Sequence, residues 1–270
     1  MWALAKVRQI SERTMQLRLR RSRDRFLQQT DWLPLPSGHG PLLVIVDGLI
    51  FKWRGKHYTC YLMLLRRPDE SEATIAPFKL ILGKETQPGW QEALDSLPTS
   101  IKARIRVVVC DGHLGPVNWA KQHHRLIQRC HFHLLAAIQG RRSRWWKSRH
   151  QAEGKRIYNL VENCLNVPDE KEAEKLLYSI DDESLTTSSP QLKHILRGFV
   201  HYYQDYRTYL YQPAFGLPTT TNAVESLNSC IKGLQYRTRG FATLNSFQKW
   251  LTALLKFKKR VTCRSKNQPN

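Results

Sequence analysis

The sequence is poor in acidic side chains. Its 270 residues contain 22 Asp and Glu against 43 Lys and Arg, so the formal net charge is +21 and the pI is close to 10. A surplus of this size is self-repulsive unless a polyanion usually neutralises it. Nucleic acid is therefore the leading candidate partner. Because 41% of the residues are apolar and 10% are aromatic, the composition is that of a globular rather than a disordered chain.

Three further patterns are missing. No apolar run approaches the roughly 20 residues that a membrane span needs, and the N-terminal residues are too basic and too interrupted for a secretory signal. The six cysteines contain no C-x-x-C spacing. We therefore expect a soluble, cytoplasmic protein whose thiols are free.

The apolar patterning predicts the α/β class with a mixed sheet. Three closely spaced runs favour an antiparallel meander, and the later runs alternate with helical segments. The predicted strands lie within residues 41–51, 56–67, 76–84, 103–113 and 126–132. We expect helices to flank this sheet.

The helical and basic segments suggest how the chain is divided. Residues 1–32 form a basic helical segment, which is either a remnant of a helix-turn-helix or a basic linker helix. Helical periodicity without strand signals predicts an all-helical insertion over 134–216. The insertion would separate 41–133 from 217–260, which together form the α/β domain, and 261–270 would be a basic flexible tail.

Two aspartates follow apolar runs and precede glycines. Asp47 follows LLVIV and Asp111 follows VVVC. Because a strand buried on both faces does not tolerate a charged carboxylate, we expect each aspartate at a strand end. The glycine after it allows the backbone to turn or another group to approach closely. If the two strands are neighbours, the two carboxylates converge.

Glu225 is the only acid between Tyr209 and Lys249. Two converging aspartates repel each other and raise each other's pKa, and Mg²⁺ relieves that repulsion. A third carboxylate would complete a site of the kind that cleaves phosphodiesters with two metal ions. Asn228 lies at i+3 from Glu225, on the same side of the predicted helix. The alternative for each acid taken singly is a strand-terminal turn or a helix surface.

The segments IVDG, VVCDGH, RCHFH and TTNAVESLN, in this order, resemble the catalytic core of DDE transposases, and the order is similar to that of the Mutator-like superfamily. The resemblance covers roughly 41 to 260. It implies an RNase H-like mixed sheet flanked by helices, with the all-helical insertion before the last catalytic helix. It also implies that Asp47, Asp111 and Glu225 hold two Mg²⁺ ions, for which Mn²⁺ substitutes.

The activity implied by the resemblance is metal-dependent cleavage at transposon ends, followed by strand transfer into target DNA. The implied partners are transposon-end DNA and target DNA, bound by a homodimer or a higher assembly in the bacterial nucleoid. Members of this family carry a larger end-binding domain ahead of the core, so we expect this chain to be shortened at its N-terminus.

Five further residues are candidates for supporting or DNA-contacting roles. Cys130 and His133 match the C-x-x-H element of the resembled family, and Asn222 matches the Asn before its glutamate. His113 and Asn228 are the other two. Zinc binding by Cys130, His133 and the adjacent His131 is an alternative, although a structural zinc site needs four ligands and no second pair is evident. Simple packing is the remaining explanation.

Several cationic and aromatic residues are candidates for contacts with DNA. Tryptophans set among cations can stack on splayed bases, or they can anchor the helices of the insertion. The C-terminal cations would bind phosphates without reading sequence, whereas the arginines of the N-terminal basic helix would suit a major groove if that helix is a helix-turn-helix remnant. The residues in this group are Arg18, Arg20, Arg21, Arg141, Arg142, Arg144, Trp145, Trp146, Lys258, Lys259 and Arg260.

Two alternatives to a transposase remain open from the sequence. One is a catalytically inactive DNA-binding derivative of a transposase, in which the acids persist without function. The other is an RNase H-like nuclease, which shares the metal site but degrades strands rather than joining them.

Overall fold

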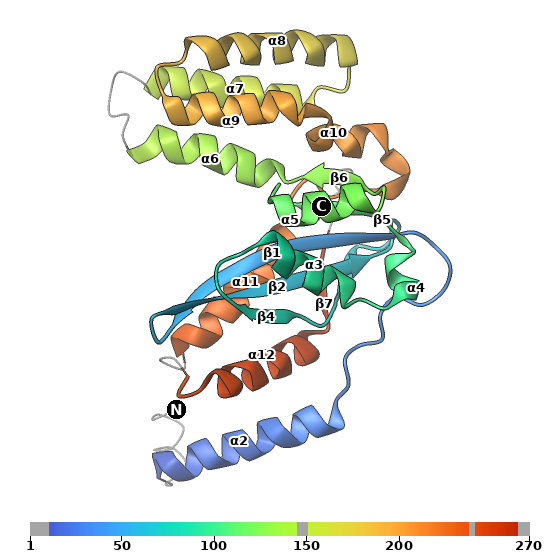
Figure 1. The fold of residues 1–270 in the computed structure, drawn as a ribbon, viewed down its shortest axis with the longest axis vertical. Coiled ribbons are helices and arrows are strands. Elements are labelled where there is room, and N and C mark those ends of the chain that lie inside the picture. The colour runs from blue at the N-terminus through green and yellow to red at the C-terminus, as the bar shows by residue number, and fades with distance from the viewer. Residues whose placement is uncertain (1–10, 145–150, 238–240, 264–270) are drawn as a thin grey trace.

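A computed structural model describes residues 11–144, 151–237 and 241–263 of the chain. Over these residues the fold is a seven-stranded mixed sheet flanked by helices, which confirms the predicted α/β class. Figure 1 shows the sheet in the middle of an elongated molecule, with a stack of helices at one end and α2 at the other. None of the described helices combines the length and the apolar character needed to cross a membrane.

The strands join antiparallel and parallel pairings in one sheet. Its order is β6-β5-β1-β2-β3-β7, and β4 pairs with β2 off this path. The β5 and β6 strands run parallel to β1, whereas the other pairings are antiparallel. The strands are β1 (Leu42–Trp53), β2 (Lys56–Arg66), β3 (Glu72–Ile75), β4 (Lys79–Leu82), β5 (Ile105–Cys110), β6 (Leu126–Arg129) and β7 (Arg260–Thr262).

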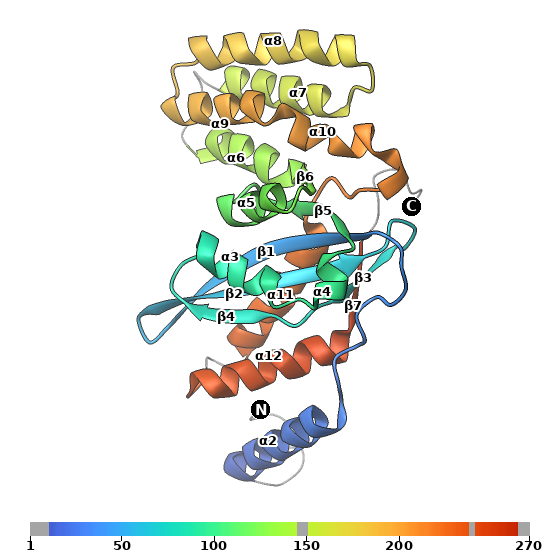
Figure 2. The same ribbon diagram turned by 45° about the vertical axis from the view of Figure 1, so that its right-hand side comes forward.

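Alternate residues of the strands fill two cores, one on each face of the sheet. Leu43 and Ile45 of β1 pack toward the C-terminal helices, whereas Leu42 and Val44 pack on the opposite side. The first face is covered by α11 (Asn222–Arg237) and α12 (Leu244–Lys258). The second is covered by α3 (Gln87–Asp95), α4 (Thr99–Lys102) and α5 (Leu114–Gln122). Figure 2 shows the sheet between these two layers.

Helices without strands occupy the described residues between β6 and α11, and they bury a core of their own. Gln128 of β6 ties this bundle to the sheet, because its amide donates to the Tyr206 carbonyl and accepts from the Tyr209 backbone N–H. The elements are α6 (His131–Arg144), α7 (Gln151–Asn166), α8 (Glu170–Thr186), α9 (Pro190–His201), α10 (Tyr203–Tyr211) and the short 3₁₀ helix η1 (Pro213–Phe215).

The N-terminal helix α2 (Glu12–Gln29) packs against α12 rather than against the sheet. Ser11 caps it, since its hydroxyl accepts from the Thr14 backbone N–H. The guanidinium of Arg23 is buried over the Trp250 ring. Residues 1–10 of the predicted basic helical segment lie outside the described residues.

The tail prediction was wrong for residues 261–263. They were expected to begin a flexible segment, but β7 pairs with β3 through Ala73 and Val261. Cys263 donates its backbone N–H to the carbonyl of Ser71. Val261 and Cys263 are buried against the α11 and α12 side of the sheet, so burial of two apolar side chains fixes this segment.

Candidate functional site

The two aspartates meet where β5 ends beside β1. Ile45 of β1 pairs with Val109 of β5, and the same parallel register continued by two residues places Asp47 beside Asp111. Asp111 follows the last residue of β5, as expected. Asp47 does not end its strand, which corrects our prediction, because β1 continues to Trp53 alongside β2. Asp47 is accommodated because its neighbour on the other side, β5, has already ended.

Each aspartate is oriented by one hydrogen bond. The Asn228 side chain on α11 donates Nδ2–H to Asp47 Oδ2 at 2.6 Å, so Asn228 contacts one of the predicted acids. The backbone N–H of His113 donates to Asp111 Oδ1 at 2.8 Å. Burial and the nearby Asp111 raise the pKa of Asp47 to about 7, and Glu85 and Glu225 act in the same direction. The neighbouring acids therefore disfavour the charged form of Asp47.

His133 of α6 lies between the aspartates and Glu225. Its ring and the carboxylates of Asp47 and Asp111 offer ligand atoms that all lie within 4.8 Å of one another. A side-chain hydrogen bond with Cys130 raises the pKa of His133 to about 9, and the two aspartates contribute to that rise. His133 is therefore cationic at neutral pH and partly offsets the acidic charge around it.

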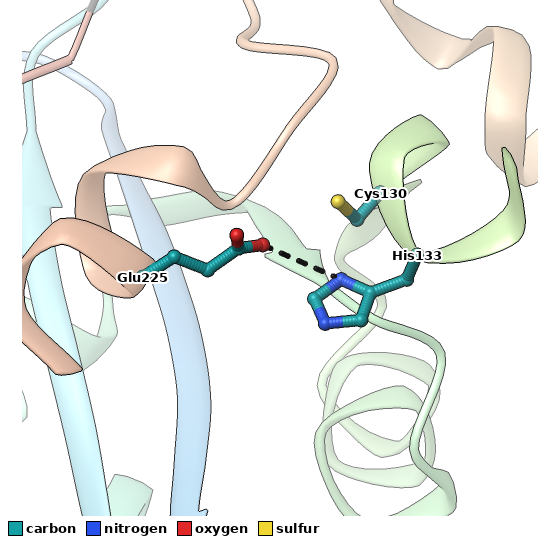
Figure 3. Close-up of side chains that lie close together, drawn as sticks. All are labelled: Cys130, His133 and Glu225. Atoms are coloured by element: carbon teal, nitrogen blue, oxygen red, sulfur yellow. Dashed lines mark ion pairs between the residues drawn. The ribbon is translucent and has the colours of Figure 1, made fainter. Parts of the chain in front are cut away.

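Glu225, on the first turn of α11, points toward His133 (Figure 3). Glu225 Oε1 lies 3.7 Å from His133 Nδ1 and accepts a 3.0 Å hydrogen bond from the Thr221 hydroxyl. Cys130, His133 and Glu225 form a second group of ligand atoms within 4.8 Å of one another. Among the described residues, the three acids do not form one set at this distance. His133 belongs to both groups and links them.

Thr221 organises the start of α11. Its backbone N–H and hydroxyl lie 3.3 and 3.4 Å from Cys130 Sγ, and its hydroxyl lies 3.4 Å from His133 Nδ1. Thr221 is fully buried and directly precedes the helix, so it holds the C-x-x-H element against the Glu225 turn. This role was not predicted from the sequence, although a Thr at a helix N-cap is a recognisable signal.

Glu85, in the loop after β4, is a second residue of the site that was not predicted from the sequence. It is an acid close enough to contribute to the raised pKa of Asp47, and its own side chain is only 15% exposed. Nothing in KETQPGW marks it as part of the site, because its neighbours there come from β1 and from the segment after β5. Only the folded chain brings these together.

The remaining predicted site residues are divided between exposed and structural positions. Asn222 is exposed on the first turn of α11, and its role stays a prediction. His131 points away from the site, since its Nε2 lies 2.7 Å from the Tyr206 carbonyl oxygen. His113 caps α5 by accepting from the Gly115 backbone N–H. Four zinc ligands do not assemble among the described residues.

The predicted DNA-contacting cations are exposed where the structure describes them, except Lys258. Arg18, Arg20 and Arg21 lie on the open faces of α2. Lys259 and Arg260 are exposed, and Arg260 pairs with Glu72, whereas Lys258 is partly buried beside Cys230. Arg141, Arg142 and Arg144 belong to α6, but their side chains are outside the described set, as are Trp145 and Trp146 entirely.

Comparison with protein families agrees with the resemblance found in the sequence. The family model described as "Transposase, Mutator family" matches residues 68–260. The matched range includes Asp111, Cys130, His133 and Glu225, and it begins beyond Asp47. No curated protein matches the sequence significantly. Since the match covers well over half of the 270 residues, the chain belongs to the Mutator family of transposases.

Proposed function

We propose that this transposase cleaves DNA at transposon ends in a metal-dependent reaction and transfers the resulting strand into target DNA. The observation that carries the proposal is the convergence of Asp47 and Asp111 at the end of β5, with Glu225 linked to them through His133. The antiparallel strands β1 and β2 are continued on the β1 side by the parallel strands β5 and β6, and this mixed arrangement supports the RNase H-like assignment.

The residues at this position fit Mg²⁺ better than a softer metal. Asp47 and Asp111 provide hard carboxylate oxygens, which Mg²⁺ and Mn²⁺ prefer. The side-chain oxygen of Asn228 is buried and has no hydrogen-bond partner among the described residues, so it is an acceptor available to water on a bound cation. When bound, divalent ions would activate the attacking oxygen and stabilise the leaving oxygen.

The remaining side chains keep the acids in place. Asn228 orients Asp47 from α11, and the turn at Gly112 allows the His113 backbone to orient Asp111. Gly112 adopts a φ of 99°, which favours glycine. Thr221 fixes the Glu225 carboxylate from the start of the same helix. We infer that His133 contacts the DNA phosphate or the metal-bound water, because it lies between the acids as a cation.

The test is an end-cleavage and joining assay. The full chain is incubated with a labelled duplex carrying the element's own terminal sequence and with a supercoiled target plasmid, in EDTA, Mg²⁺ or Mn²⁺. We expect cleaved ends and joined product only with the divalent ions. Cleavage without joining would favour the RNase H-like nuclease. Salt-sensitive binding without cleavage would favour the inactive DNA-binding derivative.

A further inference from the structure

The two faces of β1 differ sharply at the aspartate. Asp47 shares the face of Leu43 and Ile45, which is covered by α11, and it receives its hydrogen bond from that side. The next residue, Gly48, faces the opposite side and carries no side chain. A Cβ built on Gly48 would lie 2.6 Å from the Glu85 Cδ and 2.7 and 2.8 Å from its two carboxylate oxygens. Glu85 therefore occupies the space that a side chain at position 48 would take.

The backbone and side chain of Glu85 are held firmly. The next residue, Thr86, caps α3 and donates its backbone N–H to the Tyr61 hydroxyl at 3.1 Å. The buried indole of Trp90 donates to Glu85 Oε1 at 2.6 Å. No described residue donates a hydrogen bond to the other carboxylate oxygen, Oε2. One oxygen is thus fixed by the protein and the other is free to accept.

Within the described ranges, no cationic side chain compensates Glu85 by a hydrogen bond. Its nearest basic group is His113, whose Nδ1 lies 3.8 Å from Glu85 Oε1. That nitrogen already accepts from the Gly115 backbone N–H, so it carries no proton directed at the carboxylate. Burial raises the pKa of Glu85, and the charge of Asp111 raises it further. A fixed acid placed beside two others is costly unless a cation is bound there.

We propose that Glu85 is a fourth acid of the metal site, which approaches from the sheet face opposite α11 and strengthens cation binding at Asp47 and Asp111. The inference rests on the proposed function. No set of described ligand atoms within 4.8 Å of one another includes Glu85. We therefore assign its free oxygen to water molecules on the cation, because Mg²⁺ keeps several waters when proteins bind it.

Calorimetric titration of the full chain with MgCl₂, and separately with MnCl₂, tests this role. The Glu85→Gln substitution keeps an oxygen for Trp90 but removes the charge, so it is expected to weaken the Kd by about 10-fold or more. The melting temperature of this variant without metal should be unchanged or higher, because a repulsion has been removed. The proposal is overturned if Glu85→Gln binds both ions as the unchanged protein does, or if it melts several degrees lower without metal.

Asp95→Asn is the matched control. Asp95 also accepts from a buried tryptophan indole, that of Trp119 at 3.1 Å, but it lies on α3 away from Asp47 and Asp111, and its nearest cation is Lys102. We expect Asp95→Asn to bind Mg²⁺ like the unchanged protein. If Asp95→Asn weakens Mg²⁺ binding as much as Glu85→Gln does, the effect comes from losing a Trp–carboxylate hydrogen bond and not from the position of Glu85. That result would overturn the proposal.

Gly48→Ala perturbs Glu85 without changing Glu85 itself, because residue 48 lies directly against its carboxylate. The added methyl group must displace the Glu85 carboxylate, so this variant should also bind Mg²⁺ more weakly. Normal binding by Gly48→Ala would contradict the proposal. Asp111→Asn separates this inference from the proposed function: if the unchanged protein binds no Mg²⁺, or Asp111→Asn binds it normally, the metal site itself is wrong. If only Glu85→Gln and Gly48→Ala bind normally, the role of Glu85 alone is wrong.

Discussion

The helical bundle and the end of β5 both contain buried charged side chains, but they differ in how far other groups of the chain compensate that charge. In the bundle, the guanidinium of Arg207 is fully buried and every nitrogen has a partner. It donates to the carbonyls of Cys164 and Val167 at 2.8 and 2.7 Å, to Glu170 at 3.1 Å and to the Tyr211 hydroxyl at 3.4 Å. The chain itself supplies a hydrogen-bond partner for every nitrogen of this guanidinium, so the role of Arg207 is structural.

At the end of β5 the charges have the same sign and remain incompletely compensated. Burial and the charge of Asp111 raise the pKa of both Asp47 and Glu85, and His133 supplies only one positive charge. The side-chain oxygen of Asn228 also lacks a partner among the described residues. Buried polar groups are normally satisfied. The proposed metal site would account for this difference, and the following variants test the contrast.

Removing the acids should have the largest effect on activity. We expect Asp47→Ala, Asp111→Ala and Glu225→Gln each to lower end cleavage by about 10³-fold or more, because each removes a carboxylate proposed to hold the metal ions. Cleavage rates in Mg²⁺ measure this. Asp182→Asn, on the exposed face of α8, should cleave normally. Metal-dependent cleavage retained by a triad variant would remove that residue from the site.

Removing the bundle's charge should instead have the largest effect on stability. Arg207→Met removes the donor to the carbonyls of Cys164 and Val167, the first of them buried, so we expect a decrease of about 3 kcal/mol in the free energy of unfolding. Urea denaturation measures it. Arg197→Met, at an exposed position on α9, should change stability by less than about 0.5 kcal/mol. Equal effects of the two variants would contradict a structural role for Arg207.

The acid site should make metal-free stability depend on pH in an unusual direction. The pKa of Asp47 is about 7 in the folded chain against 3.8 as the ordinary value, so the folded state binds more protons between these pH values. Stability should therefore fall as pH rises through 7, by about 1 kcal/mol between pH 6 and 8. Melting in EDTA measures the trend. Asp47→Asn should reduce it, and an unchanged trend would exclude Asp47 as the source.

The exposed cations should have the smallest effect per residue. Arg18→Ala combined with Arg21→Ala is expected to lower the slope of log K for DNA against log salt by up to about 2, or roughly 0.9 for each phosphate that the variant no longer neutralises. Fluorescence anisotropy over a salt series measures this slope. Lys171→Ala with Lys175→Ala, an exposed pair on the acidic helix α8, is the control. Equal slopes for both pairs would argue against a DNA-binding role for α2.

Local signals in the sequence were sufficient for most of the fold. Apolar runs predicted β1, β2, β5 and β6, and helical periodicity predicted the elements that follow. The short strands β3 and β7 were missed because EATI and RVT are too short and too polar to stand out. Their pairing joins residues about 190 positions apart, which no local pattern specifies.

The sequence predicted those residues of the candidate site that stand out from their immediate neighbours in the chain. Asp47 and Asp111 each combine an apolar run with a following glycine, and Glu225 stands alone among cations. Thr221 and Glu85 escaped because their significance depends on contacts across the fold, with Cys130 and with Gly48. Asp47 was wrongly expected at a strand end. It lies within β1, beside the point where β5 has already ended, and the sequence of β1 alone does not show where its neighbour ends.

The most direct test of the metal site is the anomalous scattering of Mn²⁺ in crystals of the full chain. We predict a peak beside the carboxylates of Asp47 and Asp111 that disappears in Asp111→Asn. Two groups of ligand atoms compete for a metal here, and His133 belongs to both. A peak only at the group formed with Cys130 and Glu225, or no peak at either group, would contradict the account.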